Sequence, residues 1–210
     1  MRKLPVYILI DTSGSMKGEP IESVKVGIET MLSALNSDPY SLETAWVSII
    51  TFDKDVRVVL PLTPVGEVRM PDISCPDAGP THTGMALEVL CRQVDAEVRP
   101  NIPGQKGDWR PLLFLMTDGK PSDIQLYNRM TEEVKRRRFK RIVGCAAGMK
   151  ARVEPLRLLT DQVCELSTLD SHSFRKFFDW VTDSIESEVK IPGFGVSDTL
   201  PPPPNTIVLD

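Results

Sequence analysis

Several features that would assign a function directly are missing from these 210 residues. Lysine and arginine number 25 against 29 acidic residues, and the net charge of -4 does not favour binding to nucleic acid. Nowhere do roughly 18 apolar residues run together, so no membrane span is expected. The apolar stretch near the start is interrupted by Pro5 and has no small-residue cleavage site after it, which argues against a signal peptide.

Cysteine is scarce and scattered. The four cysteines are Cys75, Cys91, Cys145 and Cys164. They form no CxxC pair, so a zinc module is not indicated. Three of them lie within apolar patterns, which is typical of buried free thiols. A cytoplasmic protein with reduced cysteines is therefore expected.

Motifs of several enzyme classes are also absent. The sequence has no Walker A motif and no GxGxxG loop, which are the usual phosphate-binding loops of nucleotide-binding domains. It has no GxSxG elbow, which a serine hydrolase of the α/β class would need.

Short apolar runs alternate with helical patterns along the chain. The runs predict strands at 6–10, 46–52, 56–60, 112–116, 141–148 and 162–166. Apolar residues at helical spacing predict helices over 21–35, 83–98, 124–134, 153–160 and 174–189. Only three residues separate 46–52 from 56–60, so these two strands are expected to pair as an antiparallel hairpin. The pattern predicts an α/β fold: a doubly wound, mostly parallel sheet with one antiparallel edge strand and helices on both faces.

Two local features refine this organisation. Ser122 and Gln125 predict a capping box for a helix whose apolar face holds Ile124, Tyr127, Met130 and Val134. From position 190 the composition changes to clustered prolines without a helical period. We therefore expect one domain over 1–189 and an extended, Pro-rich tail over 190–210. Its last residues, NTIVLD, have strand propensity and could add to a sheet edge of this chain or of a partner.

Oxygen-bearing side chains follow two of the predicted strands. Asp11 ends the first strand, and Asp118 follows the very apolar run LLFLM. Ligands of a doubly wound sheet bind where the strand order reverses, so neighbouring strands would bring both carboxylates into one crevice. Two close carboxylates repel each other unless a cation or proton intervenes. Ser13 and Ser15 add neutral oxygens, and this donor set fits magnesium, which prefers about six oxygens at roughly 2.0–2.1 Å.

These segments resemble the metal-ion-dependent adhesion site (MIDAS) of the von Willebrand factor A (VWA) domain. DTSGSM matches the D-x-S-x-S motif, and TDGKPSD supplies the later aspartate. GPTHTG has the form of the family's G-x-T-x-T-G loop, which places Thr81 in the threonine position. The resemblance covers roughly residues 4–187. It implies a Mg²⁺ or Mn²⁺ site formed by Asp11, Ser13, Ser15, Thr81 and Asp118.

The resemblance also implies a function in binding. A MIDAS leaves one metal position open, and a carboxylate from a partner protein can fill it. We therefore expect a protein–protein interaction module and not an enzyme. Within the family, the chain resembles the bacterial TerY-like proteins of tellurite-resistance and stress-response gene clusters. The cysteine-rich zinc module that some of these proteins carry is absent from this sequence.

Other interpretations of the same residues remain open. The DTSGSM segment could simply be a turn-rich loop. A Mg²⁺-dependent phosphoryl-transfer enzyme could use a strand-end aspartate, although haloacid-dehalogenase phosphatases need an acidic residue where this chain has Ser13. A third possibility is a structural interaction module that uses its tail and not a metal.

Two further features are interpreted as structural. His82, beside Thr81, is expected at the surface or at the rim of the site and not as a ligand. The run KRRRFKR at 135–141 is interpreted as a solvated helix end, where cations complement the helix dipole.

Overall fold

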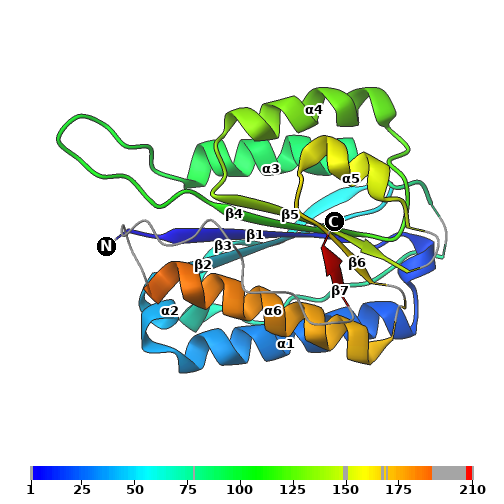
Figure 1. Cartoon of the computed structure of the whole chain (residues 1–210), viewed down its shortest axis with the longest axis horizontal. Helices are drawn as coiled ribbons and strands as arrows, with labels where there is room; N and C mark the ends of the chain where they lie inside the picture. Colours follow the sequence, from blue (N-terminus) through cyan, green and yellow to red (C-terminus); the bar gives the residue numbers. More distant parts are fainter. Residues whose placement is uncertain are drawn as a thin grey trace.

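The computed structural model describes residues 2–77, 79–148, 151–166, 168 and 170–190, together with the backbone of 207–209. Its centre is a seven-stranded sheet with the order β3-β2-β1-β4-β5-β6-β7 (Figure 1). The strands are β1 (Leu4–Asp11), β2 (Ala45–Phe52), β3 (Val56–Pro64), β4 (Leu112–Thr117), β5 (Arg141–Ala147), β6 (Val163–Leu166) and β7 (Ile207–Leu209). The central five strands are mutually parallel, and β3 pairs with β2 in the antiparallel direction.

Helices cover both faces of the sheet. They are α1 (Glu19–Ser37), α2 (Pro39–Thr44), α3 (Thr83–Glu97), α4 (Ile124–Arg136), α5 (Val153–Leu159) and α6 (Ser171–Lys190), with short 3-10 turns η1 (Gly14–Met16) and η2 (Val65–Glu67). Figure 1 shows α1, α2 and α6 on one face and α3, α4 and α5 on the other. The predicted doubly wound α/β fold is confirmed. Among the helices of the described residues, none combines the length and the apolar character that crossing a membrane would require.

The sheet has two antiparallel edge strands where one was predicted. In addition to β3, the backbone of β7 pairs with β6 at the opposite edge. Residues Ile207–Leu209 of the segment NTIVLD thus add a strand to the sheet of their own chain. The expected extended tail falls mostly on 191–206, outside the described residues, so the division of the chain at position 190 stays a prediction.

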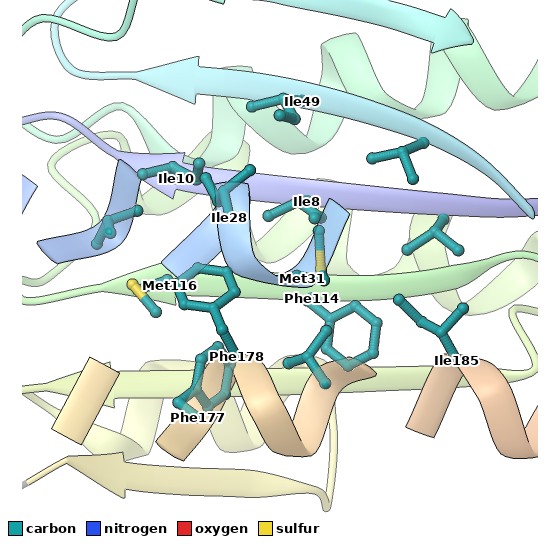
Figure 2. Close-up of a cluster of buried hydrophobic side chains, with 14 of the residues drawn as sticks. Ile8, Ile10, Ile28, Met31, Ile49, Phe114, Met116, Phe177, Phe178 and Ile185 are labelled. Atoms are coloured by element: carbon teal, nitrogen blue, oxygen red, sulfur yellow. The ribbon is translucent and has the colours of Figure 1, made fainter. Parts of the chain in front are cut away.

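Alternation along the central strands builds two apolar layers. In β1, Val6, Ile8 and Ile10 belong to the layer under α1 and α6, whereas Tyr7 and Leu9 belong to the layer under α3, α4 and α5. All five are buried because the sheet is covered on both faces. Figure 2 shows the first layer, with labelled side chains from the sheet, α1 and α6: Ile8, Ile10, Ile28, Met31, Ile49, Phe114, Met116, Phe177, Phe178 and Ile185.

Helices α1 and α6 pack closely at one point in this layer. A Cβ atom on Gly27 of α1 would lie 2.2 Å from Cδ2 of Phe178 in α6. Phe178 is buried, so its ring fills the space that any larger residue at position 27 would need. The glycine sets how near α1, which follows the DTSGSM loop, can come to the last long helix.

Two local expectations are corrected by the structure. Ser122 does not cap α4, because its hydroxyl accepts a hydrogen bond from the Thr81 backbone N–H instead. Ile124, expected on the apolar face, is 62% exposed, while Tyr127, Met130 and Val134 are buried as predicted. Helix α1 ends at Ser37 and α2 begins at Pro39, because proline is favourable in the first turn of a helix.

The cysteines agree with the interpretation of their patterns. Cys91, Cys145 and Cys164 are buried, Cys75 is half-buried, and all four are free thiols. Burial raises the pKa of the Cys164 thiol to about 12, so this side chain stays protonated at neutral pH and packs as an apolar group.

Candidate metal centre

The two predicted carboxylates meet where the strand order reverses. Strand β1 lies between β2 and β4, so the chain winds from it in both directions across the sheet. Asp11 ends β1 and Asp118 directly follows β4. The pairing of Ile10 with Met116 places Asp11 opposite Thr117, one residue before Asp118. Both carboxylates therefore lie at the carboxyl edge of the sheet, where α/β folds bind their ligands.

Asp11 is held as a buried, fully oriented carboxylate. Its exposed fraction is 0%. Its Oδ1 accepts a 2.8 Å hydrogen bond from the Ser13 backbone N–H, and its Oδ2 accepts a 2.6 Å bond from Oγ1 of Thr117. Burial raises the pKa of Asp11 to about 6; these hydrogen bonds act in the opposite direction, and the nearby charge of Asp118 adds a further rise. A cation would remove the cost of this buried negative charge.

Hydroxyl groups surround the second carboxylate. Oγ of Ser13 lies 3.2 Å from Oγ of Ser15 and 3.4 Å from Oδ1 of Asp118. Ser13, Ser15, Thr81 and Asp118 line one open pocket of about 460 Å³, together with Asp77 and three glycines. Asp11 lies beneath this pocket and is linked to it through Ser13. The structure thus brings together all five residues that the sequence predicts, and their role as metal ligands stays a prediction.

Thr81 is positioned by the loop that follows β4. The Thr81 N–H donates to Oγ of Ser122 at 3.0 Å, and the Ser122 N–H donates to the Thr81 carbonyl at 2.8 Å. The neighbouring Asp123 accepts hydrogen bonds from the backbone N–H groups of Gly84 and Met85 in the first turn of α3. No local sequence pattern predicts these hydrogen bonds, because the paired residues lie about 40 positions apart.

Asp53 is a second residue that sequence analysis does not identify. It is 1% exposed at the end of β2, and its Oδ2 accepts a 3.1 Å hydrogen bond from Oγ1 of Thr12. Its backbone carbonyl accepts a 2.9 Å bond from the N–H of His82. Asp53 therefore joins the loop after Asp11 to the loop that contains Thr81. The sequence signal that could have found it is its place directly after an apolar strand, the same place that Asp11 occupies.

We expect Asp53→Ala to weaken Mn²⁺ binding by about 10–100-fold, the usual effect of losing a residue that orients metal ligands. The substitution removes the bond to Thr12 and loosens the junction of the two loops. Isothermal titration calorimetry with Mn²⁺ would measure the change. Asp55→Ala is the matched control. It removes the same charge only two residues along the chain, and the Asp55 side chain is 59% exposed. Equal losses in the two variants would contradict an orienting role for Asp53.

His82 does not contribute to the lining of the pocket. Its Nδ1 lies 2.9 Å from the carbonyl oxygen of Lys54, and the residue is half-buried. Of the two places expected for His82, the surface and the rim of the site, the rim is not where it lies, and its exclusion from the metal ligands stays a prediction. Asp77, which lines the pocket, forms an ion pair with Lys17.

The donor set fits a hard divalent cation. Two carboxylates and three hydroxyls, from Asp11, Ser13, Ser15, Thr81 and Asp118, are oxygen donors of the kind that Mg²⁺ and Mn²⁺ prefer. Within the described part of the chain, no three His, Cys, Asp or Glu side chains gather as a metal cluster. Most of the donors are therefore neutral hydroxyls, and five protein oxygens would leave a six-coordinate cation one open position.

Comparison with known proteins agrees with the fold. The family model described as von Willebrand factor type A domain matches residues 6–165. No curated protein matches the sequence. Among solved structures, proximal thread matrix protein 1 from the mussel byssus is 16% identical, with a TM-score of 0.65 over 87% of this chain and 48% of that chain.

Two further structures are similar. A von Willebrand factor type A protein from Catenulispora acidiphila is 19% identical, with a TM-score of 0.63 over 88% of this chain and 43% of its own. Another structure of the mussel protein has a zinc-occupied MIDAS motif; it is 15% identical, with a TM-score of 0.64 over 87% and 48% of the two chains. The chain spans about half the length of these proteins, and at such identities the likeness shows the fold alone.

Proposed function

The chain belongs to the von Willebrand factor type A family, and on this premise we propose that it is a metal-dependent protein-interaction module. A Mg²⁺ or Mn²⁺ ion is held by Asp11, Ser13, Ser15, Thr81 and Asp118. A carboxylate from a partner protein completes the coordination. The convergence of these five residues at the reversal point of the sheet is the observation that supports the proposal most directly.

The open pocket favours recognition of a ligand from outside. Ser15 is exposed, while Asp11 is fully buried beneath it, so the donors approach a cation from the protein side only. The two ionised carboxylates balance the charge of a dication, and the hydroxyl donors add no further negative charge. The protein donors leave one coordination position of the ion open to solvent. An anionic group arriving from solvent is then attracted to the remaining open position.

We propose binding in preference to turnover. A phosphatase that uses a strand-end aspartate needs a second acidic residue as its general acid, and at that position this chain has Ser13. The Ser13 hydroxyl is committed to the short chain of contacts with Ser15 and Asp118. Phosphoryl transfer would be revealed by hydrolysis of p-nitrophenyl phosphate in Mg²⁺, or by a stable aspartyl adduct with beryllofluoride.

We also propose the narrower setting that the sequence suggests. The overall likeness to bacterial TerY-like proteins supports a cytoplasmic role in tellurite resistance or stress response. The four free thiols are consistent with a reducing compartment.

Water-proton relaxation with Mn²⁺ tests the proposed site and its open position together. We expect stoichiometric Mn²⁺ binding that Mg²⁺ competes away and a bound ion that keeps exchangeable water. Acetate and N-acetylglutamate should lower the relaxation enhancement, because a carboxylate displaces that water. Asp118→Ala should abolish binding, and Asp161→Ala, which removes an exposed carboxylate at the other edge of the sheet, should not. The proposal would be overturned if acetate and N-acetylglutamate left the relaxation enhancement of bound Mn²⁺ unchanged.

A further inference from the structure

One carboxylate of the open pocket is not among the predicted metal ligands. Asp77 lines the pocket together with Ser13, Ser15, Thr81 and Asp118. Among the described residues of this lining, Asp77 and Asp118 are the two that carry a charge. The Asp77 side chain is 89% exposed, and exposed side chains exchange rotamers rapidly. A metal ion in the pocket would therefore have a further, movable carboxylate of the same chain beside it.

The backbone on either side of Asp77 is anchored next to the site. Before it, Ile73 is 1% exposed and Cys75 packs against the apolar layer under α1 and α6. After it, Thr81 is fixed by its two hydrogen bonds with Ser122. A carboxylate that is tethered over so short a distance has a high effective concentration at the pocket.

Without a metal ion, the pocket is unfavourable for another negative charge. Asp11 is buried beneath it, and Asp118 lines it. Burial raises the pKa of the Cys75 thiol to about 11, and the charges of Asp11, Asp53 and Asp118 add to the rise. This effect shows that the segment around Cys75 lies within the negative field of the site. Asp77, two residues further on, is repelled by the same carboxylates.

Lys17 provides a different partner for Asp77. It directly follows η1, two residues after Ser15, and its ammonium group forms an ion pair with the Asp77 carboxylate. The pair connects the loop after β1 with the connection between η2 and α3. Both side chains are more than half exposed, so the pair adds little stability and can open readily.

A bound dication reverses the balance of these forces. The ion compensates the charges of Asp11 and Asp118, and its open coordination position attracts a carboxylate. Asp77 is already part of the pocket lining, so its carboxylate is available for that position. Lys17 and the metal ion then compete for the same carboxylate.

We propose that Asp77 is an internal competitor for the open metal position, and that Lys17 limits this competition. The inference rests on the proposed function, because it requires bound Mg²⁺ or Mn²⁺. A carboxylate from outside must displace Asp77, which is always present at the site. A partner protein that adds further contacts can do so, whereas free carboxylates of small molecules bind less well. The pair of Lys17 and Asp77 thereby selects for a protein ligand.

The exchangeable water on bound Mn²⁺ tests this proposal. It is measured by water-proton relaxation at saturating Mn²⁺, without any added carboxylate. Asp77→Ala should raise the relaxation enhancement per bound ion, because the competing carboxylate is gone. Lys17→Gln should lower it, because Asp77 loses its other partner; an exposed ion pair shifts such an equilibrium by about two- to fivefold. The double variant should behave as Asp77→Ala does.

Titration with N-acetylglutamate gives a second measurement on the same variants. Its affinity for the Mn²⁺-loaded protein should increase in Asp77→Ala and decrease in Lys17→Gln. A purely electrostatic effect of the two charges would produce the same changes in affinity. It would, however, leave the relaxation enhancement without added carboxylate unchanged, and that result would overturn the proposal.

The matched controls are Asp72→Ala and Lys54→Gln. Asp72 is an exposed carboxylate on the same connection as Asp77, and Lys54 is an exposed lysine whose Cβ would lie 3.9 Å from a Cβ on Gly79. Both controls should keep the wild-type enhancement. Equal changes in the controls, or an effect of Lys17→Gln that persists in the double variant, would overturn the inference and leave the metal site intact. Absence of Mn²⁺ binding by the wild type would overturn the proposed function and this inference with it.

Discussion

Asp11→Asn is expected to abolish Mn²⁺ binding and at the same time to stabilise the metal-free protein. The carboxylate of Asp11 is completely buried, and burial raises its pKa from 3.8 to about 6. At neutral pH Asp11 is therefore ionised in the folded protein, where its charge is less favourable than in the unfolded chain. Asparagine has nearly the same shape, can accept the hydrogen bond from the Ser13 N–H, and has no charge to bury.

The gain in stability should depend on pH. The unfolded chain releases the Asp11 proton near pH 4, whereas the folded protein releases it near 6, so between these values the folded state binds more protons. The free energy of unfolding of the metal-free wild type should then fall as pH rises from 4 to 6. Above this range Asp11→Asn should be more stable by about 1–3 kcal/mol, since one pKa unit corresponds to about 1.4 kcal/mol.

Urea unfolding in EDTA across this pH range measures the effect, and calorimetry with Mn²⁺ measures the loss of binding. Asp55→Asn is the control, because the side chain it neutralises is more than half exposed. The prediction fails if Asp11→Asn is less stable than the wild type at pH 7.5, or if it still binds Mn²⁺. Mn²⁺ should reverse the order of stability, since only the wild type gains binding energy.

Gly84→Ala is expected to destabilise the protein and to weaken Mn²⁺ binding together. A Cβ atom at position 84 would lie 2.4 Å from the backbone nitrogen of Tyr127 and 2.9 Å from Oδ2 of Asp123. The backbone of Tyr127 cannot rotate out of the way as a side chain can, so α3 must move away from α4. This movement strains the hydrogen bonds by which Asp123 caps the first turn of α3. Overpacking of this kind costs about 1–3 kcal/mol, and more where the contact is rigid.

The expected loss of Mn²⁺ affinity in Gly84→Ala follows from the position of Gly84 beside the site. Gly84 lies in the first turn of the helix that follows Thr81, and Ser122 and Asp123 hold this loop against the one that contains Asp118. Urea unfolding and Mn²⁺ titration of the same variant would measure both losses. Gly66→Ala is an informative control: its Cβ would also lie 2.9 Å from a neighbour, but the neighbour is Cδ1 of the exposed Leu42, which can move. Similar destabilisation by both substitutions would show that the rigidity of the contact is not decisive.

The local sequence could predict the parts of the site that directly follow a strand. Asp11 and Asp118 follow apolar runs, and parallel strands bring their carboxyl ends to one edge, so their meeting follows from the fold class. Ser122 shows the opposite case. Its spacing to Gln125 is that of a capping box, yet its hydroxyl bonds the backbone of Thr81, because a partner distant in sequence satisfies it better.

Thr81 was assigned through the resemblance to the VWA family. The sequence by itself determined the α/β fold, the alternation that fills both apolar layers, and the oxygen-bearing residues Asp11, Ser13, Ser15 and Asp118 at the strand ends. These features depend on the spacing of apolar residues and on the order of strands and helices, and both can be recognised in the linear sequence. Only the tertiary structure decided that Asp53 joins two site loops and that β7 pairs with β6 of its own chain. Such contacts join segments far apart in sequence, and their geometry is set by packing of the whole domain.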